Sequence, residues 1–355
     1  MSIAVIGSSV ISEDPSPVRL WCVGGVPSAE RHLHRYRFRV FGCDAEIVSA
    51  ERPAVPLAQA AAELHALDVR LSRFRPDSEL SLLNEAKGTP REVSPVLARL
   101  LASSLVASLA SDGAVNVAVL PALERAGYRS RWPAPLEALP PEADESLRWG
   151  ADPPAVPFLP AVLDLTGRRA RLRPGTMVDL GALAKGVLAE ATTRRLGGNA
   201  CCCLGGDVHA AGPGPDGSGW PVGIPTGEVL LVRDASVATS GVGQRRWGPG
   251  LHHLIDPTTG LPSQSDVVRA TAASDDPVMA EWLSTAAVVR GTPALFTLDR
   301  APAWLWLETT AGGVRTAGAA AVNVRTDRLA TRRAVPRAGW SLAGYISTEQ
   351  MAPVR

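Results

Sequence analysis

The chain has 355 residues and a net charge of +1, and 46% of its residues are hydrophobic. This apolar content suffices for a sizeable core, and the length allows one large domain or two closely packed ones. Because the charge is balanced and only 5% of the residues are aromatic, the composition argues against a surface that recruits nucleic acid. A membrane-spanning helix needs about 20 consecutive apolar residues. The sequence contains no such run, so we expect no membrane insertion.

Five cysteines are present, and three of them are consecutive: Cys201, Cys202 and Cys203. They match neither a disulfide framework nor a CxxC metal motif. Since neighbouring residues of a strand point to opposite faces of a sheet, three cysteines in a row do not converge on one metal. We interpret them as small buried residues. The opening segment lacks the basic region of a secretion signal, and together these features predict a cytoplasmic protein.

In chain order, residues 1–30 are expected to form an N-terminal arm. Residues 36–49 alternate polar and apolar side chains around Gly42, which predicts a hairpin or a bulged strand. Residues 133–160 are rich in Pro, Glu and Ala and predict a surface excursion, and an Arg-bearing extension ends the chain at 313–355. The remaining predictions are helices over 57–71, 95–111 and 277–290, a short helix within 72–84 capped by Asp77 or Ser78, a helix that is entered through 177–180, holds Lys185 and ends at 196, and strands over 161–165, 170–172, 200–204, 220–224, 229–232, 236–240 and 267–273.

The segment DLGALAKG, from Asp179 to Gly186, is the most informative motif. The chain has only two lysines, Lys87 and Lys185, among its 36 basic residues. A compact ammonium beside the free N–H groups of a helix start suits an anion, most simply a phosphate. The alternative is an ordinary surface lysine near the start of a helix. The segment does not fit the Walker A pattern.

Glu281 and Thr285 lie four residues apart on the predicted helix that follows Asp276 and Pro277. Residues at this spacing share one helix face. A carboxylate and a hydroxyl on one face can supply two hard oxygen ligands to Mg²⁺, with phosphate and water oxygens completing the shell. The alternative is an ordinary helix face with one solvated carboxylate.

Three further motifs carry polar groups next to breaks in the predicted structure. His253 precedes Asp256 by three residues in a predicted turn, an arrangement that could orient a general base. The motif Gly205-Gly206-Asp207 follows a predicted buried strand and would let the backbone approach a ligand closely. Ser240-Gly241 offers a hydroxyl and an open N–H at the end of a strand. Each motif is also compatible with a simple turn or loop cap.

The order of these motifs is more specific than any one of them. The segments SRFRPDSELSLLN (72–84), DLGALAKG, GGD, TSG and HLIDPTTG (253–260) follow one another along the chain. In this order, from Tyr36 to Gly312, the sequence resembles the FAD:protein FMN transferases, also called ApbE-type flavin transferases. The resemblance implies an α+β fold of mixed, largely antiparallel sheets flanked by helices. It also implies a domain over 31–312 with two tightly joined lobes and the ligand between them.

The resemblance further implies a reaction. FMN would pass from FAD to a Thr or Ser hydroxyl of an acceptor flavoprotein, AMP would be released, and Mg²⁺ would sit at the pyrophosphate. The implied acid–base residue is His253, and Asp256 is the second predicted catalytic residue because it could hold His253 in place. The implied metal ligands are Ala182, through its carbonyl, Glu281 and Thr285. The implied FAD-binding residues are Arg73, Ser78, Asn84, Asp179, Lys185, Gly205, Gly206, Asp207, Ser240 and Gly241.

Some positions depart from the family pattern. Glu281 stands where the family usually has Asp, and the extra methylene shifts a carboxylate by about an ångström at a site where Mg²⁺ demands regular geometry. Asn116 replaces an acidic residue and Cys43 replaces a threonine, while Val242 and Gly243 fill aromatic and acidic positions. Two other functions therefore stay open, an FAD hydrolase that forms FMN and AMP and an FAD-binding protein without catalysis.

Overall fold

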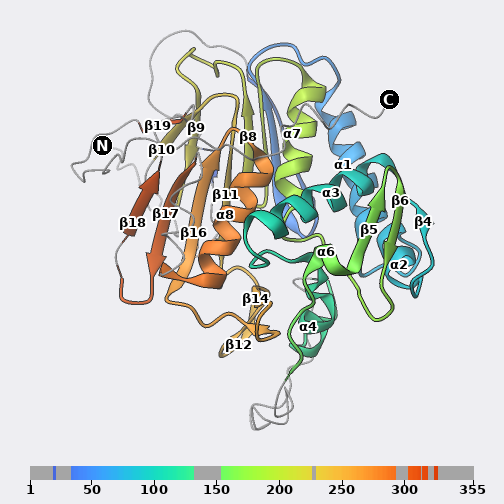
Figure 1. Cartoon of the computed structure of the whole chain (residues 1–355). Helices are drawn as coiled ribbons and strands as arrows, with labels where there is room; N and C mark the ends of the chain where they lie inside the picture. Colours follow the sequence, from blue (N-terminus) through green and yellow to red (C-terminus); the bar gives the residue numbers. More distant parts are fainter. Residues whose placement is uncertain are drawn as a thin grey trace, which may run out of the picture.

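Eight antiparallel strands form the central sheet, and helices cover one of its faces (Figure 1). The computed structural model describes residues 19–20, 33–131, 153–225, 229–292, 303–312, 314–318 and 324–326. The strand order is β18-β17-β16-β11-β8-β7-β3-β2. These strands are β2 (His34–Val40), β3 (Cys43–Ser49), β7 (Ala200–Leu204), β8 (Asp207–Ala211), β11 (Ala235–Gly241), β16 (Val267–Ser274), β17 (Trp304–Thr309) and β18 (Val314–Gly318).

Two helices lie side by side on this sheet, α7 (Ala184–Leu196) and α8 (Pro277–Arg290) (Figure 1). Asp276 caps α8 by accepting a hydrogen bond from the N–H of Val278 at 2.8 Å, and Pro277 fits the first turn because its missing N–H needs no partner there. Helix α7 has no side-chain cap at Leu183. The helices α1 (Leu57–Leu71) and α3 (Pro95–Ala110) complete this layer, which shares one apolar core with the sheet.

The opposite face of the central sheet packs against a smaller sheet. Its order is β1-β9-β10-β19, and all its pairs are antiparallel. Because the central sheet is covered on both faces, β7 is buried along its whole length. Cys202 enters the core under the helices, and Cys201 and Cys203 enter the core between the sheets. The small sheet consists of β1 (Arg19–Leu20), β9 (Trp220–Gly223), β10 (Val229–Val232) and β19 (Val324–Thr326).

The predicted burial of the three cysteines is therefore confirmed. Burial raises the pKa of the Cys203 thiol to about 12, so this thiol stays protonated and packs as an apolar group. Among the residues that the structure describes, no group of three or more His, Cys, Asp and Glu side chains could hold a metal ion. In the same residues, no helix is long and apolar enough to cross a membrane.

Smaller elements surround the end of the sheet where β7, β8 and β11 reach the site. A three-stranded sheet has the order β4-β6-β5, and two hairpins lie near α4 in the lower part of Figure 1. These elements are α2 (Glu79–Asn84), β4 (Arg91–Glu92), the 3₁₀ turn η1 (Val117–Val119), α4 (Leu120–Arg125), α6 (Leu159–Val162), β5 (Leu163–Thr166), β6 (Arg169–Leu172), β12 (Arg246–Gly248), β13 (Leu251–His252), β14 (Ile255–Asp256) and β15 (Leu261–Pro262).

The α+β fold with antiparallel sheets is confirmed, and most predicted elements lie within two residues of their predicted bounds. Two differ. The predicted strand over 161–165 begins with α6, because Pro160 favours the start of a helix. The helix that carries Lys185 begins only at Ala184. The segment before it follows an irregular path, because the N–H of Val178 donates to Asn84 Oδ1 and the N–H of Asp179 donates to the Val117 carbonyl.

Parts of three predicted segments lie outside the described residues. Of the N-terminal arm only Arg19–Leu20 are described, and this strand pairs with β9. Of the surface excursion, residues 133–152 fall outside. In the C-terminal extension, β18 pairs with β17 and β19 pairs with β10. The division into an arm, a domain and an extension stays a prediction.

Candidate active site

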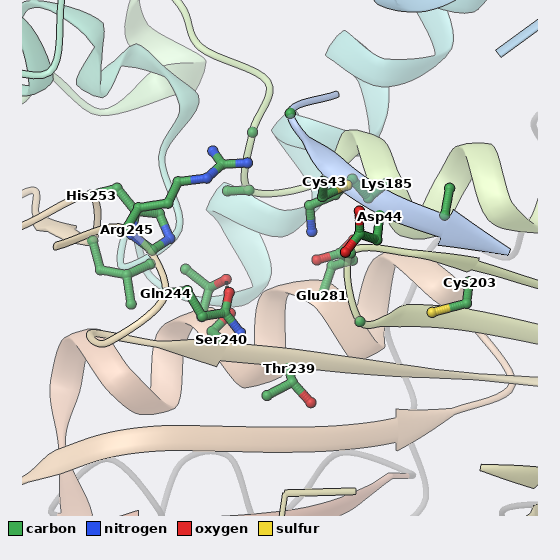
Figure 2. A pocket seen from close by; sticks show the side chains of 18 of the residues that line it. Cys43, Asp44, Lys185, Cys203, Thr239, Ser240, Gln244, Arg245, His253 and Glu281 are labelled. Atoms are coloured by element: carbon green, nitrogen blue, oxygen red, sulfur yellow. Dashed lines mark hydrogen bonds between the residues drawn. The ribbon is translucent and has the colours of Figure 1, made fainter. Parts of the chain in front are cut away.

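A cavity of about 920 Å³ opens beside the ends of the central strands. Figure 2 shows Lys185 and Glu281 on one side of it and Arg245 and His253 on the other, with Ser240 between them. The cavity is built from segments far apart in the sequence. They contribute, among others, Gly42, Cys43, Asp179, Gly181, Ala182, Lys185, Gly205, Gly206, Thr239, Ser240, Gln244, Arg245, His253, Glu281 and Thr285.

Lys185 forms an ion pair with Asp207. Asp207 is 1% exposed and also accepts a hydrogen bond from the N–H of Thr239 at 3.1 Å. Lys185 lines the cavity, whereas Asp207 lies behind it and does not. The lysine is therefore a held cation at the start of α7, and the carboxylate serves as its counterion. Gly205 and Gly206 line the cavity beside this pair with positive φ angles of 62° and 103°.

Glu281 reaches from α8 to the start of α7. Its Oε1 accepts a hydrogen bond from the N–H of Gly186 at 2.6 Å, and the side chain lines the cavity although the residue is only 3% exposed. A Cβ on Gly186 would lie 2.8 Å from the Cγ of Glu281, so the approach needs glycine. Burial raises the pKa of Glu281, and the ammonium of Lys185 and the N–H of Gly186 oppose this rise.

Three hydroxyl groups meet next to Glu281. The Ser240 Oγ lies 2.9 Å from Thr285 Oγ1 and 3.0 Å from Ser284 Oγ. Ser240 and Thr285 line the cavity. Gly241 does not, and a Cβ there would meet the Arg269 side chain and the Val268 carbonyl at 3.3 Å. Gly241 thus provides close packing between β11 and β16.

Ala182, Glu281 and Thr285 fit a magnesium ion in the type of donor that they offer. All three line one cavity, and a backbone carbonyl, a carboxylate and a hydroxyl are oxygen donors of the kind Mg²⁺ binds. The Gly186 N–H occupies only one of the two Glu281 oxygens. No larger cluster of carboxylates exists among the described residues. Such a site suits a cation that completes its shell with water and phosphate oxygens, as Mg²⁺ does.

Arg73, whose side chain is buried, forms an ion pair with Asp179 at the wall of the cavity. Arg73 Nε lies 2.6 Å from Asp179 Oδ2, and the Arg73 side chain is 4% exposed. The guanidinium carbon stands 4.1 Å from the centre of the Phe74 ring and 4.5 Å from that of Tyr128. The N–H of Gly181 donates to Asp179 Oδ1 at 2.7 Å. Arg73 thus fixes the cavity-lining carboxylate and does not itself line the main cavity.

Ser78 and Asn84 also lie away from the main cavity. Ser78 caps α2 by accepting from the N–H of Ser81 at 3.0 Å. The Asn84 amide makes two bonds with the backbone of Val178, at 2.8 and 3.0 Å. Both residues were predicted to bind FAD, but Asn84 holds the segment that leads to Asp179 and Ser78 caps the helix that carries Asn84.

His253 lines the cavity opposite Lys185. Its Nδ1 is buried, and no described residue forms a hydrogen bond with this atom. Burial lowers the pKa of His253 well below its usual value, and the Arg245 guanidinium lowers it further. The ring is therefore neutral at pH 7. By contrast, His252 has a structural role, because its Nε2 lies 2.9 Å from the Ser263 carbonyl.

Asp256 is not brought to the site. Its Oδ1 accepts hydrogen bonds from the N–H of Thr258 at 2.9 Å and from the Thr258 hydroxyl at 2.7 Å. The carboxylate closes the β14–β15 turn and does not line the cavity. Among the described residues, His253 and Asp256 form no hydrogen bond with each other, although this pair was predicted. The Asp256 carboxylate bonds to Thr258 instead, because an Asp in a turn bonds to the residue two positions later.

Several residues that line the cavity were not among the predicted site residues, and they include Cys43, Tyr128, Gln244 and Arg245. Arg245 Nη1 donates to the Tyr128 hydroxyl at 3.3 Å, and the Tyr128 ring stacks on Trp247 at 5.3 Å. Arg245 is one of 34 arginines in the chain, so its type gave no signal. The one available signal was its place between Ser240 and His253.

The sequence is similar to those of named enzymes. The chain is 28% identical over 247 residues to an FAD:protein FMN transferase of Haemophilus influenzae, covering 63% of this chain and 69% of the relative. It is 32% identical over 276 residues to the enzyme of that name from Treponema pallidum, covering 69% and 75%.

Solved structures share the fold. The apo flavinyl transferase ApbE of Pseudomonas stutzeri superposes with a TM-score of 0.68 at 21% identity, covering 82% of this chain and 97% of that one. The ApbE protein of Thermotoga maritima gives 0.68 at 22% identity, covering 81% and 97%. The model of the ApbE family matches residues 40–303, and the chain belongs to this family.

Proposed function

We propose that the protein is a Mg²⁺-dependent flavin transferase, which moves FMN from FAD to a Thr or Ser hydroxyl of an acceptor flavoprotein and releases AMP. The observation that carries this proposal is one cavity that holds a fixed cation, Lys185, an oxygen donor set around Glu281 and a neutral imidazole, His253. The names of the relatives point to the same activity.

The reaction needs compensation of negative charge at the pyrophosphate. The acceptor oxygen attacks the phosphorus of the FMN half, the bond from this phosphorus to the bridging oxygen breaks, and AMP leaves with the bonding electrons. Charge builds on the phosphate oxygens during this step. Lys185 can meet it, since its ammonium is held at the cavity wall by the buried Asp207.

The acceptor hydroxyl must lose its proton during the attack. His253 is neutral at pH 7 because burial and Arg245 lower its pKa, so the ring can accept this proton. We place no role on Asp256, whose carboxylate is engaged with Thr258. The orientation of His253 would instead come from its own strand end and from Arg245 beside it (Figure 2).

Glu281, Thr285 and the Ala182 carbonyl would hold the magnesium ion. Bound there, Mg²⁺ would supply Lewis-acid stabilisation of the pyrophosphate oxygens. Gly186 orients Glu281 through its N–H, and Ser240 orients Thr285 through its hydroxyl. We also propose a cytoplasmic location on the ground that the four cysteines of the described part, Cys43 and Cys201 to Cys203, are free thiols.

A covalent labelling assay tests this function. The protein is incubated with FAD, Mg²⁺ and a purified acceptor domain of a covalent FMN-bearing flavoprotein, and the intact mass of the acceptor is measured. We expect a mass gain equal to FMN less one water, which is lost without Mg²⁺ and lost when the acceptor hydroxyl is removed. AMP release with an unlabelled acceptor would instead establish an FAD hydrolase. Intact FAD under all conditions would contradict both.

A further inference from the structure

Asn116 joins separate segments of the chain through one buried side chain. The residue is 5% exposed and directly precedes η1. Its Oδ1 accepts a hydrogen bond from the N–H of Ala118 at 2.9 Å, which caps η1, and its Nδ2 donates to the Pro157 carbonyl at 2.9 Å. The carbonyl of the next residue, Val117, accepts from the N–H of Asp179 at 2.8 Å. Asn116 therefore connects the chain before α6 to the segment that carries Asp179.

The connecting segment, residues 154–157, also contacts the turn between β14 and β15. The N–H of Val156 donates to the Pro257 carbonyl at 2.8 Å. A Cβ on Gly260, where φ is +67°, would lie 2.5 Å from the carbonyl oxygen of Pro154. The turn therefore needs glycine at this point, and the connecting segment lies directly against it.

These contacts link residues that line the cavity but come from different parts of the chain. His253 lies two residues before β14, and Asp179 and Ala182 follow the bond from Val117. All three of these residues line the cavity, whereas Asn116 does not. In the connecting segment, Val156 packs against both the main core and the small core beside α4. Asn116 can thus act on a ligand only through the residues that it holds in place.

An amide is the group that suits both partners of this side chain. The N–H of Ala118 needs an acceptor, and the Pro157 carbonyl needs a donor. Asparagine offers an oxygen acceptor and an NH₂ donor at once, whereas an ionised carboxylate of the same size only accepts. An aspartate could therefore cap η1 but could not bond to the connecting segment.

We propose that Asn116 is a positioning residue, which holds His253 and the segment with Asp179 and Ala182 at the separation that FMN transfer needs. The inference rests on the proposed function, in which His253 takes the proton of the acceptor hydroxyl and the Ala182 carbonyl binds the metal ion at the pyrophosphate. These groups act on one reaction, and a displacement of about 1 Å caused far from the chemistry can cost about 100-fold in rate.

Binding of FAD should depend less on this connection than the transfer rate does. Lys185 is held by its ion pair with Asp207, and Glu281 by the N–H of Gly186. These contacts do not involve the connecting segment. A loss of turnover with little loss of affinity is therefore the signature that distinguishes positioning from a general weakening of the fold.

Asn116→Asp tests this role, because it keeps the size of the side chain and the capping oxygen but replaces the Nδ2 donor with an oxygen. The turnover number kcat for transfer to the acceptor domain is measured at saturating FAD and Mg²⁺, at a temperature where all variants are folded. The dissociation constant for FAD and the ligand-free melting temperature are measured alongside. We expect kcat to fall about tenfold, while the dissociation constant for FAD changes by less than about threefold.

Asn116→Ser is a second variant, which keeps the test decisive if the aspartate prevents folding. Serine is a good helix cap and is uncharged. Its hydroxyl ends one bond short of the Nδ2 position, so the Pro157 carbonyl loses its partner while the cap of η1 remains. We expect kcat to fall in this variant too, again with little change in the affinity for FAD.

Asn199→Asp is the matched control. Asn199 is 6% exposed, and its amide also joins two backbone segments, because it accepts from the N–H of Gly214 at 2.8 Å and donates to the Gly214 carbonyl at 3.1 Å. It does not line the cavity. We expect Asn199→Asp to lower the melting temperature and to leave kcat unchanged.

The comparison of kcat decides the inference. An equal fall of kcat in Asn199→Asp would show a general effect of a buried aspartate and would overturn it. A weaker affinity for FAD with unchanged kcat in both Asn116 variants would also contradict it. If these variants keep kcat within about twofold of a wild type that transfers FMN, the inference fails while the proposed function stands. If the wild type transfers no FMN, both fail.

Discussion

The N–H of Gly186 in α7 donates to the carboxylate of Glu281 in α8 at 2.6 Å. This bond joins the helix that carries Lys185 to the helix that carries the proposed metal ligands. Helix α7 lacks a side-chain cap of its own, so Glu281 satisfies one of its free N–H groups from a distance. The Glu281 side chain therefore has a structural task.

Gly186→Ala tests the closeness of this contact. A new Cβ would lie 2.8 Å from the Glu281 Cγ and 2.9 Å from its Oε1, so the carboxylate must move. Overpacking of this kind costs about 1–3 kcal/mol, which exceeds the roughly 1 kcal/mol that alanine gains over glycine in a helix. We expect a lower free energy of unfolding in urea. We also expect that a higher Mg²⁺ concentration is needed for half-maximal turnover. The control is Gly243→Ala, where a Cβ meets nothing within 4 Å.

Glu281→Gln separates two roles of this side chain, the hydrogen bond that it accepts from the Gly186 N–H and the negative charge of its carboxylate. Glutamine keeps an oxygen for the Gly186 N–H but removes a carboxylate whose pKa is raised by burial. Because the folded pKa lies above the unfolded value, the native state of the wild type loses stability as pH rises through that interval. The stability gain of Glu281→Gln should therefore grow from pH 4 to pH 8 in the absence of ligand. The increase in unfolding free energy that Mg²⁺ and FAD together produce in the wild type should be absent in Glu281→Gln.

A pH-independent stability difference between Glu281→Gln and the wild type would contradict the raised pKa. If Mg²⁺ still stabilises the variant as it does the wild type, Glu281 is not a metal ligand.

Arg73→Ala tests the ion pair with Asp179. Removal of Arg73 leaves the Asp179 carboxylate without its cation, and because that carboxylate is 17% exposed at the cavity wall, the cost should stay below the about 3–5 kcal/mol of a fully buried pair. The side chain also leaves its place between two aromatic rings. We expect a loss of stability, measured by urea unfolding. Asp179→Asn in the Arg73→Ala background should recover part of it, because the orphaned charge is then removed. Arg75→Ala, at an exposed pair with Asp77, should leave stability unchanged.

His253 and His252 should differ in their pH and stability behaviour. Burial and Arg245 lower the pKa of His253, so its neutral form persists below pH 6.5. The rate of transfer should therefore show no acidic limb near pH 6.5. His253→Ala should abolish transfer while FAD still binds. His252→Ala should lower the melting temperature instead, because it removes the bond to the Ser263 carbonyl. An acidic limb centred at 6.5 would contradict a neutral, buried base.

Local sequence signals predicted the helices and strands well. The site residues were predicted less well, because they depend on contacts between residues far apart in the sequence. Gly42 marked the hairpin, and Asp276 with Pro277 marked the start of α8, since caps and turns are written in neighbouring residues. Ser78 and Asn84 were predicted at the ligand, but Asn84 bonds to the backbone of Val178 and Ser78 caps the helix that carries Asn84. Nothing in a local pattern tells whether a side chain contacts the ligand or the segment that does.

The same limit explains two other outcomes. Arg73 meets Asp179 through tertiary packing, which the spacing of the two residues does not encode. Asp256 lies three residues from His253, yet its carboxylate turns toward Thr258. Short polar side chains in turns bond to their own backbone first. Sequence proximity was thus a poor guide to contact at this turn.

The release of AMP from FAD tests the central claim most directly. Purified protein is incubated with FAD with and without Mg²⁺, and the nucleotides are separated by chromatography. The arrangement of Lys185, Glu281 and Thr285 around one cavity predicts AMP formation that requires Mg²⁺ and is lost in Glu281→Gln. FAD that binds and stays intact with Mg²⁺ and an acceptor domain present would contradict catalysis and leave a flavin-binding protein.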